Sequence, residues 1–391
     1  MLKKRKLLYI GSLMPNILID KFISLSLPLV DFATNNYQRA LLSSLMLTDC
    51  EIDAISCPFI RFDINNIKSS FIKSFGFEEN NEYKFYATST TTIPILRHLY
   101  ELFIISFYIF KKTRTNHYRD VIIFSLHSSF ILPIIIHKIF SKKVYNIIVV
   151  VDDLPALMSN DNGLFYKLLK YIDSLLLNWI KNYVSKWILL SKYMANTIGP
   201  HDLNYLTMES IFMPQHNQEK NCTDQILSIN TRNLLLTKYF MYAGNLDTRY
   251  GIKNLVDAFI LFSSKNNNEI SLIIVGSGSE YETLLEIAKL NMNIFILPPI
   301  NRFLINMYLS KAFALILPTS PQEEFTRYFF PSKLLEYMAS GSITISTNLP
   351  CLPCEYHEHL YLIDDNEIET LKLTFKKLFT MSKVKREKIG L

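Results

Sequence analysis

Short apolar runs alternate with amphipathic stretches along most of the chain, and the alternation forms two successive series. In the first series, apolar runs predict strands over residues 6–10, 120–126, 144–151, 186–190 and 206–213. Apolar residues at helical spacing predict helices over 37–47, 128–140, 163–182 and 192–197. Because continuously apolar strands alternate with helices, the pattern indicates a parallel α/β sheet.

The alternation stops in a polar segment without periodicity and then starts again. This segment, residues 214–236, predicts a linker between an N-terminal domain (1–213) and a C-terminal domain (237–391). The second series predicts strands over 239–243, 271–275, 294–297, 314–317 and 343–346, and helices over 252–263, 280–290, 302–311 and 332–339. We therefore expect two Rossmann-like α/β domains.

The composition narrows the class of protein. The hydrophobic content of 49% excludes a disordered chain, and the two longest apolar runs are too short or too polar to span a membrane. The basic N-terminus is followed by an apolar run of only about four residues, which indicates a first strand rather than a signal peptide. Five cysteines in 391 residues do not suggest a disulfide framework, so we expect a cytoplasmic protein.

Positive charge is concentrated in the N-terminal part. Residues 1–150 carry 18 Lys and Arg against 11 Asp and Glu, although the whole chain has a net charge of +6. Such a field suits an anionic partner. Nucleic acid is disfavoured because no zinc-finger or RNP motif accompanies the charge, and an anionic membrane surface fits the apolar composition better. An ordinary solvated basic face is the alternative.

Glycine is scarce but clustered. Only 10 of the 391 residues are glycine, and five of these lie between residues 244 and 341. Gly244 stands in one loop between a predicted strand and helix, and Gly276 and Gly278 stand in another. Such loops place backbone amides at a helix start, so the two together predict a cradle for a diphosphate. Arg249 in the first loop can pair with phosphate, or can be an ordinary surface arginine.

A third candidate lies in residues 318–341, where a proline precedes and a glycine follows the predicted helix 332–339. Ser332 and Lys333 stand at the positive end of this helix, where phosphate oxygens are favoured. We expect the helix to be largely buried, so Glu336 needs hydrogen-bond donors. The vicinal hydroxyls of a ribose would supply them, and a structural salt bridge is the alternative.

Two groups of residues raise the question of a metal. Asp152 and Asp153 end a predicted strand, as His127 does, but no third ligand is in register with the two carboxylates. We expect them to be acceptor-side contacts instead. The other group is Cys351, Cys354, His357 and His359, whose spacing is too short for a standard zinc finger. We therefore expect no metal and no cofactor.

Taken together, these segments resemble glycosyltransferases of the GT-B fold, and family 4 in particular. MYAGNLDTRYGIKNLVDAF, SLIIVGSGSEYETLLEIA, NIFILPPINRFLINMYLSKAFALILPTS and FFPSKLLEYMASGSITISTNLP occur in the family's order and spacing over residues 239–363. DVIIFSLHSSF, VVVDDLPALMS and ILLSKYM are more loosely similar to its N-terminal strands. The FPSKLLEYM segment resembles bacterial enzymes that build capsule, O-antigen or other surface polysaccharides. The resemblance implies two α/β domains that face each other across a cleft.

The resemblance also implies roles for the donor-side residues. Glu336 matches the second of two family glutamates and would bind the nucleotide ribose. The first glutamate falls on Tyr328, so that carboxylate is missing. The loop after it would line the donor site through Tyr328, Phe330 and Ser332, although it lacks the family's glycines.

The resemblance implies further roles for residues that stabilise the charge of the donor diphosphate and for one residue on the acceptor side. The family's basic pair falls on Asn245 and Tyr250, so Arg249 and Lys333 are expected to stabilise the diphosphate in its place. His127 matches a histidine beside the donor sugar. In this fold a last helix commonly crosses back to the N-terminal domain, and residues 383–391 are where it would begin.

The implied function is retaining transfer of a sugar from a nucleotide-sugar donor to a lipid-linked glycan, without a metal. The enzyme would be peripheral to the inner face of the plasma membrane. Tyr328 favours an alternative, a non-catalytic GT-B subunit of a polysaccharide assembly complex. Nucleotide-sugar epimerisation on the same fold is a third possibility.

Overall fold

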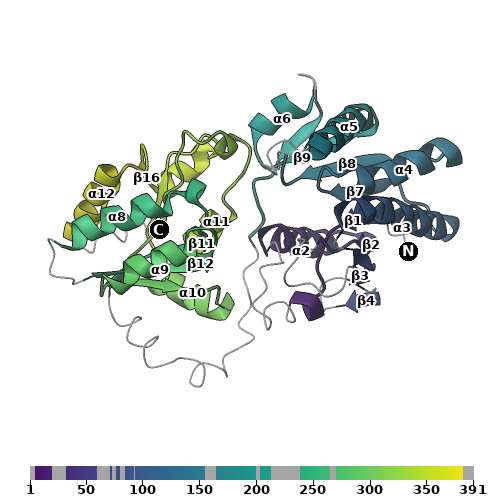
Figure 1. Cartoon of the computed structure of the whole chain (residues 1–391). Coiled ribbons are helices and arrows are strands. Elements are labelled where there is room, and N and C mark those ends of the chain that lie inside the picture. The colour runs from purple at the N-terminus through teal and green to yellow at the C-terminus, as the bar shows by residue number, and fades with distance from the viewer. Residues whose placement is uncertain are drawn as a thin grey trace. The chain divides into compact units, whose positions relative to one another are not determined.

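The computed structural model describes residues 5–19, 32–59, 71–72, 76–79, 84–91, 93–154, 164–199, 203–212, 238–264, 270–300 and 302–381. The chain forms two compact units, Met1–Ile211 and Phe212–Leu391. Each contains a mainly parallel sheet with helices against it (Figure 1). The expected linker 214–236 and the expected crossover at 383–391 lie outside the described residues.

The first unit is built on an eight-stranded sheet in the order β10-β9-β8-β7-β1-β2-β5-β4. Its strands are β1 (Arg5–Gly11), β2 (Cys50–Ser56), β4 (Gly76–Glu79), β5 (Lys84–Ala87), β7 (Asp120–Phe124), β8 (Asn146–Val151), β9 (Lys186–Leu189) and β10 (Tyr205–Thr207). All neighbouring strands are parallel except β4, which pairs antiparallel with β5 at the edge. A separate antiparallel pair joins β3 (Phe71–Ile72) to β6 (Thr90–Thr91).

The helices of this unit are α2 (Phe32–Met46), α3 (Pro94–Thr115), α4 (Ser128–Ser141), α5 (Leu164–Ile180) and α6 (Lys192–Ile198). Parallel crossovers are right-handed. The crossover through α2 adds β2 on one side of β1, whereas the crossovers through α3, α4 and α5 add β7, β8 and β9 on the other side. This topology places α2 on one face of the sheet and α3, α4 and α5 together on the other. The last three are in contact, α3 with α4 and α4 with α5.

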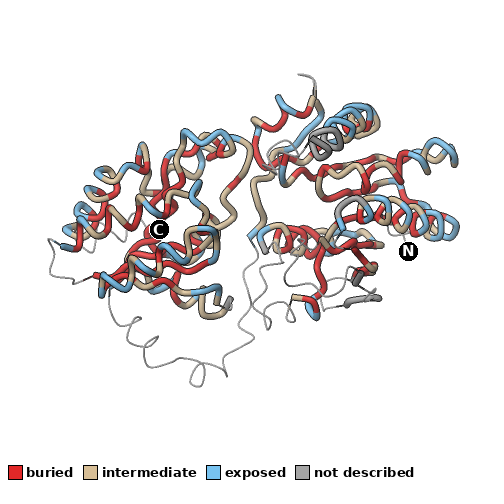
Figure 2. The backbone as a smooth tube through the Cα atoms, viewed as in Figure 1, coloured by how far each residue is buried: buried red, intermediate tan, exposed pale blue. Residues whose placement is uncertain are grey.

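The second unit is built on a six-stranded, all-parallel sheet in the order β13-β12-β11-β14-β15-β16. Its strands are β11 (Lys238–Asn245), β12 (Ile270–Ser277), β13 (Ile294–Leu297), β14 (Ala314–Leu317), β15 (Thr344–Thr347) and β16 (Tyr361–Ile363). Its helices are α8 (Ile252–Ser263), α9 (Tyr281–Lys289), α10 (Arg302–Lys311), α11 (Ser332–Ala339) and α12 (Ile368–Thr380). Buried strands run through the middle of both units (Figure 2).

Most of the predicted elements are present, and two expectations are wrong. The strand predicted over 206–213 is only β10, Tyr205–Thr207; the Met208 amide still bonds the Leu189 carbonyl oxygen, but residues 208–212 are not in a strand. Helix α11 is less buried than its apolar composition indicated. Leu334 and Tyr337 are its buried residues, whereas Ala339 is exposed. No helix among the described residues is long and apolar enough to cross a membrane.

Candidate functional site

A pocket opens at the carboxyl ends of the central strands of the first unit. Its lining includes side chains that follow β1, β7 and β8, because parallel strands end at the same edge of a sheet. The predicted residues His127, Asp152 and Asp153 all line this pocket. The other lining residues are Ser12, Met14, Thr34, Asn35, Gln38, Phe59, Glu101, Ser125 and Phe130.

The backbone between β7 and α4 positions His127. Ser125 has a φ of 75°, a conformation that residues other than glycine rarely adopt, and its amide donates to the Val150 carbonyl oxygen at 2.8 Å. His127 is then the N-cap residue of α4, with an extended backbone. The sharp turn at Ser125 therefore directs His127 toward the pocket at the end of the strand.

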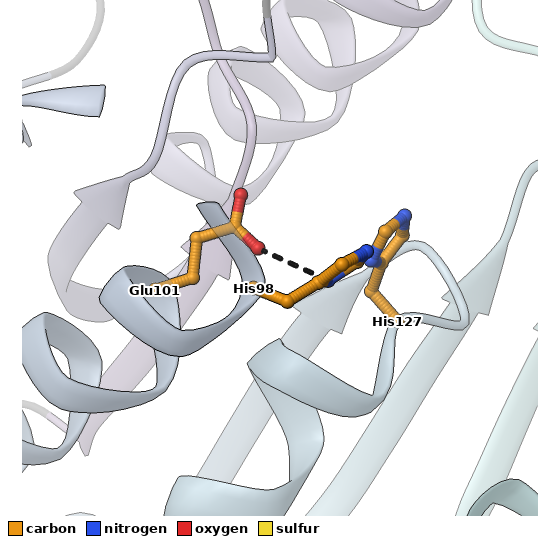
Figure 3. A group of neighbouring side chains, drawn as sticks. All are labelled: His98, Glu101 and His127. Carbon is orange, nitrogen blue, oxygen red and sulfur yellow. Dashed lines mark ion pairs between the residues drawn. The ribbon is translucent and has the colours of Figure 1, made fainter. Parts of the chain in front are cut away.

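His127 belongs to a cluster with two side chains of α3 (Figure 3). The rings of His98 and His127 stack with their centroids 5.3 Å apart, and Nδ1 of His98 lies 3.8 Å from Oε2 of Glu101. Glu101 is only 2% exposed. Its Oε2 accepts a hydrogen bond from Ser129 at 2.7 Å, and its Oε1 lies 3.7 Å from Nε of Arg97. The cluster thus joins α3 to the start of α4.

Burial lowers the pKa of His127 to about 3, with further lowering by the neighbouring His98 and Arg97. Burial likewise lowers the pKa of His98. Burial raises the pKa of Glu101 to about 7, opposed by the hydrogen bond from Ser129 and by the charge of Arg97. At neutral pH His127 is therefore a neutral imidazole that can donate or accept a hydrogen bond but carries no charge.

Two imidazoles and a carboxylate are possible metal ligands, and within the described part of the chain these three form a group whose ligand atoms lie within 4.8 Å of one another. Glu101, however, already pairs with Arg97 and Ser129. A guanidinium charge beside the cluster disfavours a metal cation. We therefore interpret the group as a packing cluster, held by ring stacking of the two histidines and by the contacts of Glu101 with Ser129 and Arg97. Cys351 and Cys354, one buried and the other exposed, do not form such a group with His357 and His359 among the described residues.

In the second unit the two glycine-containing loops lie side by side. Strands β11 and β12 pair in a register that sets Gly244 beside Gly276 and Asn245 beside Ser277. A Cβ atom on Gly276 would overlap the carbonyl oxygen of Gly244, and one on Gly278 would lie 2.5 Å from the backbone of Leu246. These glycines are therefore required for the two loops to pack against each other.

Two of the amides expected to form an anion cradle at the start of α9 already have hydrogen-bond partners within the protein. The amide of Ser279 donates to Oδ1 of Asp247 at 3.0 Å, and the amide of Glu280 donates to the Leu246 carbonyl oxygen at 2.9 Å. The Asp247 carboxylate thus already occupies the place that a phosphate was expected to take. Gly276 and Gly278 shape the loops and do not open these amides to a ligand.

Helix α11 is fixed to β11 by Tyr337. This fully buried side chain accepts a hydrogen bond from the Ala243 amide at 2.6 Å and donates one to the Ala243 carbonyl oxygen at 3.1 Å. Ala243 directly precedes Gly244, so the second turn of α11 is anchored next to the first glycine loop. One turn earlier, Nζ of Lys333 lies 3.1 Å from Oε2 of Glu336, which remains partly exposed.

Arg249 is exposed and lies among aromatic rings. Its guanidinium is 5.1 Å from the ring centroid of Tyr250 and 4.9 Å from that of Phe325. The rings of Phe325 and Phe329 are also in contact, with centroids 5.1 Å apart. These contacts join the loop after β11 to the loop before α11. Arg249 keeps its charge at the surface, where an anion can reach it.

The C-terminal residues match a known family. Residues 232–390 match the model described as Glycosyl transferases group 1. This match covers most of the C-terminal unit. No match is found among curated proteins.

Solved structures resemble nearly the whole chain. Sucrose-phosphate synthase from Thermosynechococcus elongatus is 14% identical, with a TM-score of 0.65 over 99% of this chain and 92% of that chain. HepE of Anabaena in complex with UDP is 11% identical, with a TM-score of 0.58 over 99% of this chain and 92% of that chain. The lipopolysaccharide outer core galactosyltransferase WaaB in its apo form is 15% identical, with a TM-score of 0.52 over 95% of this chain and 90% of that chain. At these identities the likeness shows the GT-B fold. With the domain match, the protein is a glycosyltransferase.

The remaining predicted donor-side residues of the glycosyltransferase domain lie near α11. Tyr328 and Ser332 are partly exposed, whereas the Phe330 side chain is 4% exposed and packs against Tyr356. Asn245 is exposed, and its Oδ1 accepts a hydrogen bond from the Asp247 amide at 3.0 Å. Phe330 is thus a core residue, which can approach a donor only through its backbone.

Several residues of the first unit were missed by the sequence prediction. Buried Gln38 accepts a hydrogen bond from the Ser12 amide at 2.9 Å and donates to the Ser12 hydroxyl, which fixes the loop after β1. Asn35 similarly accepts from the Met14 amide at 2.8 Å. For Gln38, a polar residue on the apolar face of the predicted helix 37–47 is the signal that could have identified it, whereas Asn35 lies before the start of that predicted helix.

Replacing Tyr337 with Phe should weaken both the fold and the expected donor site of the glycosyltransferase. The change leaves two buried backbone groups of Ala243 without their partner, which costs about 1–3 kcal/mol of unfolding free energy. Tyr239→Phe is the matched control, because its hydroxyl makes one buried hydrogen bond, to the Tyr308 carbonyl oxygen at 2.7 Å, away from α11. Urea unfolding measures both variants. An equal or smaller loss for Tyr337→Phe contradicts the anchoring role.

Proposed function

We propose that the enzyme transfers a sugar from a nucleotide-sugar donor to a lipid-linked glycan of a bacterial surface polysaccharide, with retention at the anomeric carbon. The observation that carries the proposal is the match to group 1 glycosyltransferases over residues 232–390. It is supported by Tyr337, which follows Glu336 in α11 and bonds Ala243 at the end of β11. Of the similar structures, HepE is in complex with UDP, and WaaB is a lipopolysaccharide galactosyltransferase. Both likenesses support this substrate class.

The donor would bind at the carboxyl ends of β11, β12 and β14. Glu336 is proposed to accept hydrogen bonds from the two ribose hydroxyls, in exchange for its present pairing with Lys333. Lys333 is then released toward the diphosphate, where Arg249 provides a second positive charge. As the bond between the anomeric carbon and the phosphate oxygen breaks, these two cations stabilise the charge that develops on the leaving diphosphate.

The pocket of the first unit is proposed to hold the transferred sugar and the acceptor. The neutral imidazole of His127 can hydrogen-bond a sugar hydroxyl without competing for the leaving-group charge. Asp152 and Asp153 would accept hydrogen bonds from acceptor hydroxyls. Thr34 donates to Oδ2 of Asp152 at 3.4 Å, which orients this carboxylate at the pocket wall. No step of this scheme uses a metal.

A donor screen followed by a transfer assay tests the proposal. Nucleotide-sugars with different bases and sugars are compared by thermal shift, and the donor that stabilises the protein is then radiolabelled. We expect label to pass into a lipid-extractable product when bacterial membrane lipids are added, with the anomeric configuration of the donor. Donor binding without hydrolysis or transfer would favour a non-catalytic subunit, and product without any acceptor would favour epimerisation.

Replacing Glu336 with Ala should raise the dissociation constant of the donor. The lost charged hydrogen bonds correspond to about 1–3 kcal/mol. Glu286→Ala is the control, because Glu286 forms the same kind of pair with Lys289 three residues away, on the exposed surface of α9. Isothermal titration of both variants with the selected donor gives the comparison. Unchanged affinity in Glu336→Ala would remove Glu336 from the ribose site.

A further inference from the structure

The outer side of α3 carries a continuous apolar stripe. Its large exposed side chains recur at helical spacing, and they are Leu96, Leu99, Phe103, Phe107 and Phe110. At 3.6 residues per turn they fall within a sector of about 80°, and the stripe is about 21 Å long. The Phe103 side chain, for example, is 69% exposed. A stripe of this kind normally faces a core, but here it faces outward.

The two neighbouring helices extend this stripe into a broad face. Helix α4 exposes Ile136, Ile139 and Phe140, and α5 exposes Tyr171, Ile172, Leu175 and Trp179. Helices α3 and α4 run parallel, since Glu101 bonds Ser129 near their starts and Thr113 bonds His137 near their ends. We call these exposed side chains of the three helices the α3–α5 face. Its apolar extent is typical of an interaction surface.

Positive charge borders this face at the ends of the two parallel helices. The basic residues there are Lys111, Arg114, Lys138, Lys142 and Lys143. The guanidinium of Arg114 lies 4.2 Å from the ring centroid of Phe110, so a positive charge stands directly at the end of the stripe. The acidic residue of α3 is the buried Glu101, and α4 contains none. The face therefore combines apolar side chains with cations.

We propose that the α3–α5 face binds the surface of an anionic phospholipid bilayer, with the helices lying in the plane of the membrane. Aromatic and aliphatic side chains would enter the acyl boundary, while the lysines and Arg114 meet anionic headgroups. A second copy of the chain fits less well. Its identical face would bring further basic side chains, whereas the acidic residues of the three helices, Glu101 and Asp173, already accept hydrogen bonds from Ser129 and Ser128.

The position of the α3–α5 face relative to the pocket indicates what membrane binding would do for the enzyme. The stripe begins at Leu96, five residues before Glu101, which lines the pocket from the buried side of the same helix. A bilayer against α3 would hold a lipid-linked acceptor with its lipid in the membrane and its glycan near the pocket. This use rests on the proposed function. The binding itself does not require a donor or an acceptor and is measured separately.

Sedimentation with sucrose-loaded vesicles tests the proposal on the full chain. We expect binding to vesicles of phosphatidylcholine with phosphatidylglycerol, and much weaker binding to phosphatidylcholine alone. Phe103→Ser with Phe107→Ser should lower the partition coefficient at least about tenfold, because two apolar side chains no longer enter the bilayer. Lys111→Gln with Arg114→Gln should lower it on anionic vesicles and reduce its dependence on salt.

The matched control is Leu290→Ser with Met292→Ser, which removes two side chains that are 86% and 89% exposed on the other unit. We expect it to bind vesicles as the wild type does. The proposal is overturned if the phenylalanine variant and this control lose vesicle binding equally, or if the wild type does not bind vesicles. It is also overturned by a wild-type dimer, seen by analytical ultracentrifugation, that ignores vesicles and dissociates in the phenylalanine variant. If the wild type binds vesicles but binds no nucleotide-sugar, only the proposed function is overturned.

Discussion

Gly276→Ala should destabilise the glycosyltransferase domain by about 3 kcal/mol or more, because the added methyl group meets a backbone atom that cannot move alone. The Cβ would overlap the carbonyl oxygen of Gly244 on the neighbouring strand. Relieving the overlap would separate the ends of β11 and β12, which pair directly at this point. Since the proposed donor site lies at these strand ends, donor binding should fall together with stability. Thermal unfolding and a donor titration on the same preparation measure both effects.

Gly341→Ala provides the comparison for this prediction. Gly341 follows α11 with a φ of 74°, but no atom lies within 4 Å of the position that a Cβ would take there. The substitution therefore costs only the left-handed backbone conformation, about 1–2 kcal/mol. If both alanine variants lose the same stability, backbone conformation and not loop packing accounts for the glycine at 276.

His127→Ala should lower turnover about 10²–10³-fold, the range for removing one well-placed hydrogen-bonding group, and leave donor affinity unchanged. The side chain lines the pocket and is held by ring contacts with His98 and Phe130. Its pKa of about 3 lies below the working range, so the imidazole stays neutral as the pH rises. The fold-loss should therefore be the same at about pH 6 and about pH 8.

His137→Ala is the control for this variant. His137 lies on the same helix, where its ring contacts Thr113, Ser141 and Tyr145, and it does not line the pocket. It should lower stability with little effect on the turnover of folded protein. Full activity in His127→Ala, or a loss that changes with pH as a residue titrating near neutrality would, contradicts a role as a neutral hydrogen-bonding group.

The strands and loops that position the site could be predicted because their signals are local. Continuous apolar runs mark β7, β8, β11 and β12, and the residue after each parallel strand must lie at the same edge of the sheet. This reasoning brought His127, Asp152 and Asp153 to one pocket. It also predicted that the loops of Gly244 and Gly276 are neighbours.

The features that were missed depend on contacts between distant segments. Tyr337 looks like any core tyrosine until α11 docks on Ala243, 94 residues away. Asp247 was not expected to cap Ser279, so the amides at the start of α9 were interpreted as open. Helix α3 was missed because apolar residues occur all around it. One side packs inward with Glu101, and the other forms the α3–α5 face.

Hydrogen exchange of the full chain with and without its donor tests the central claim most directly. The claim is that the nucleotide-sugar binds at the loops that Tyr337 and the glycines hold together. At saturating concentrations of the nucleotide-sugar selected by thermal shift, we expect protection of backbone amides in residues 243–251 and 328–336. Protection confined to the first unit, with these two segments unchanged, would contradict the account.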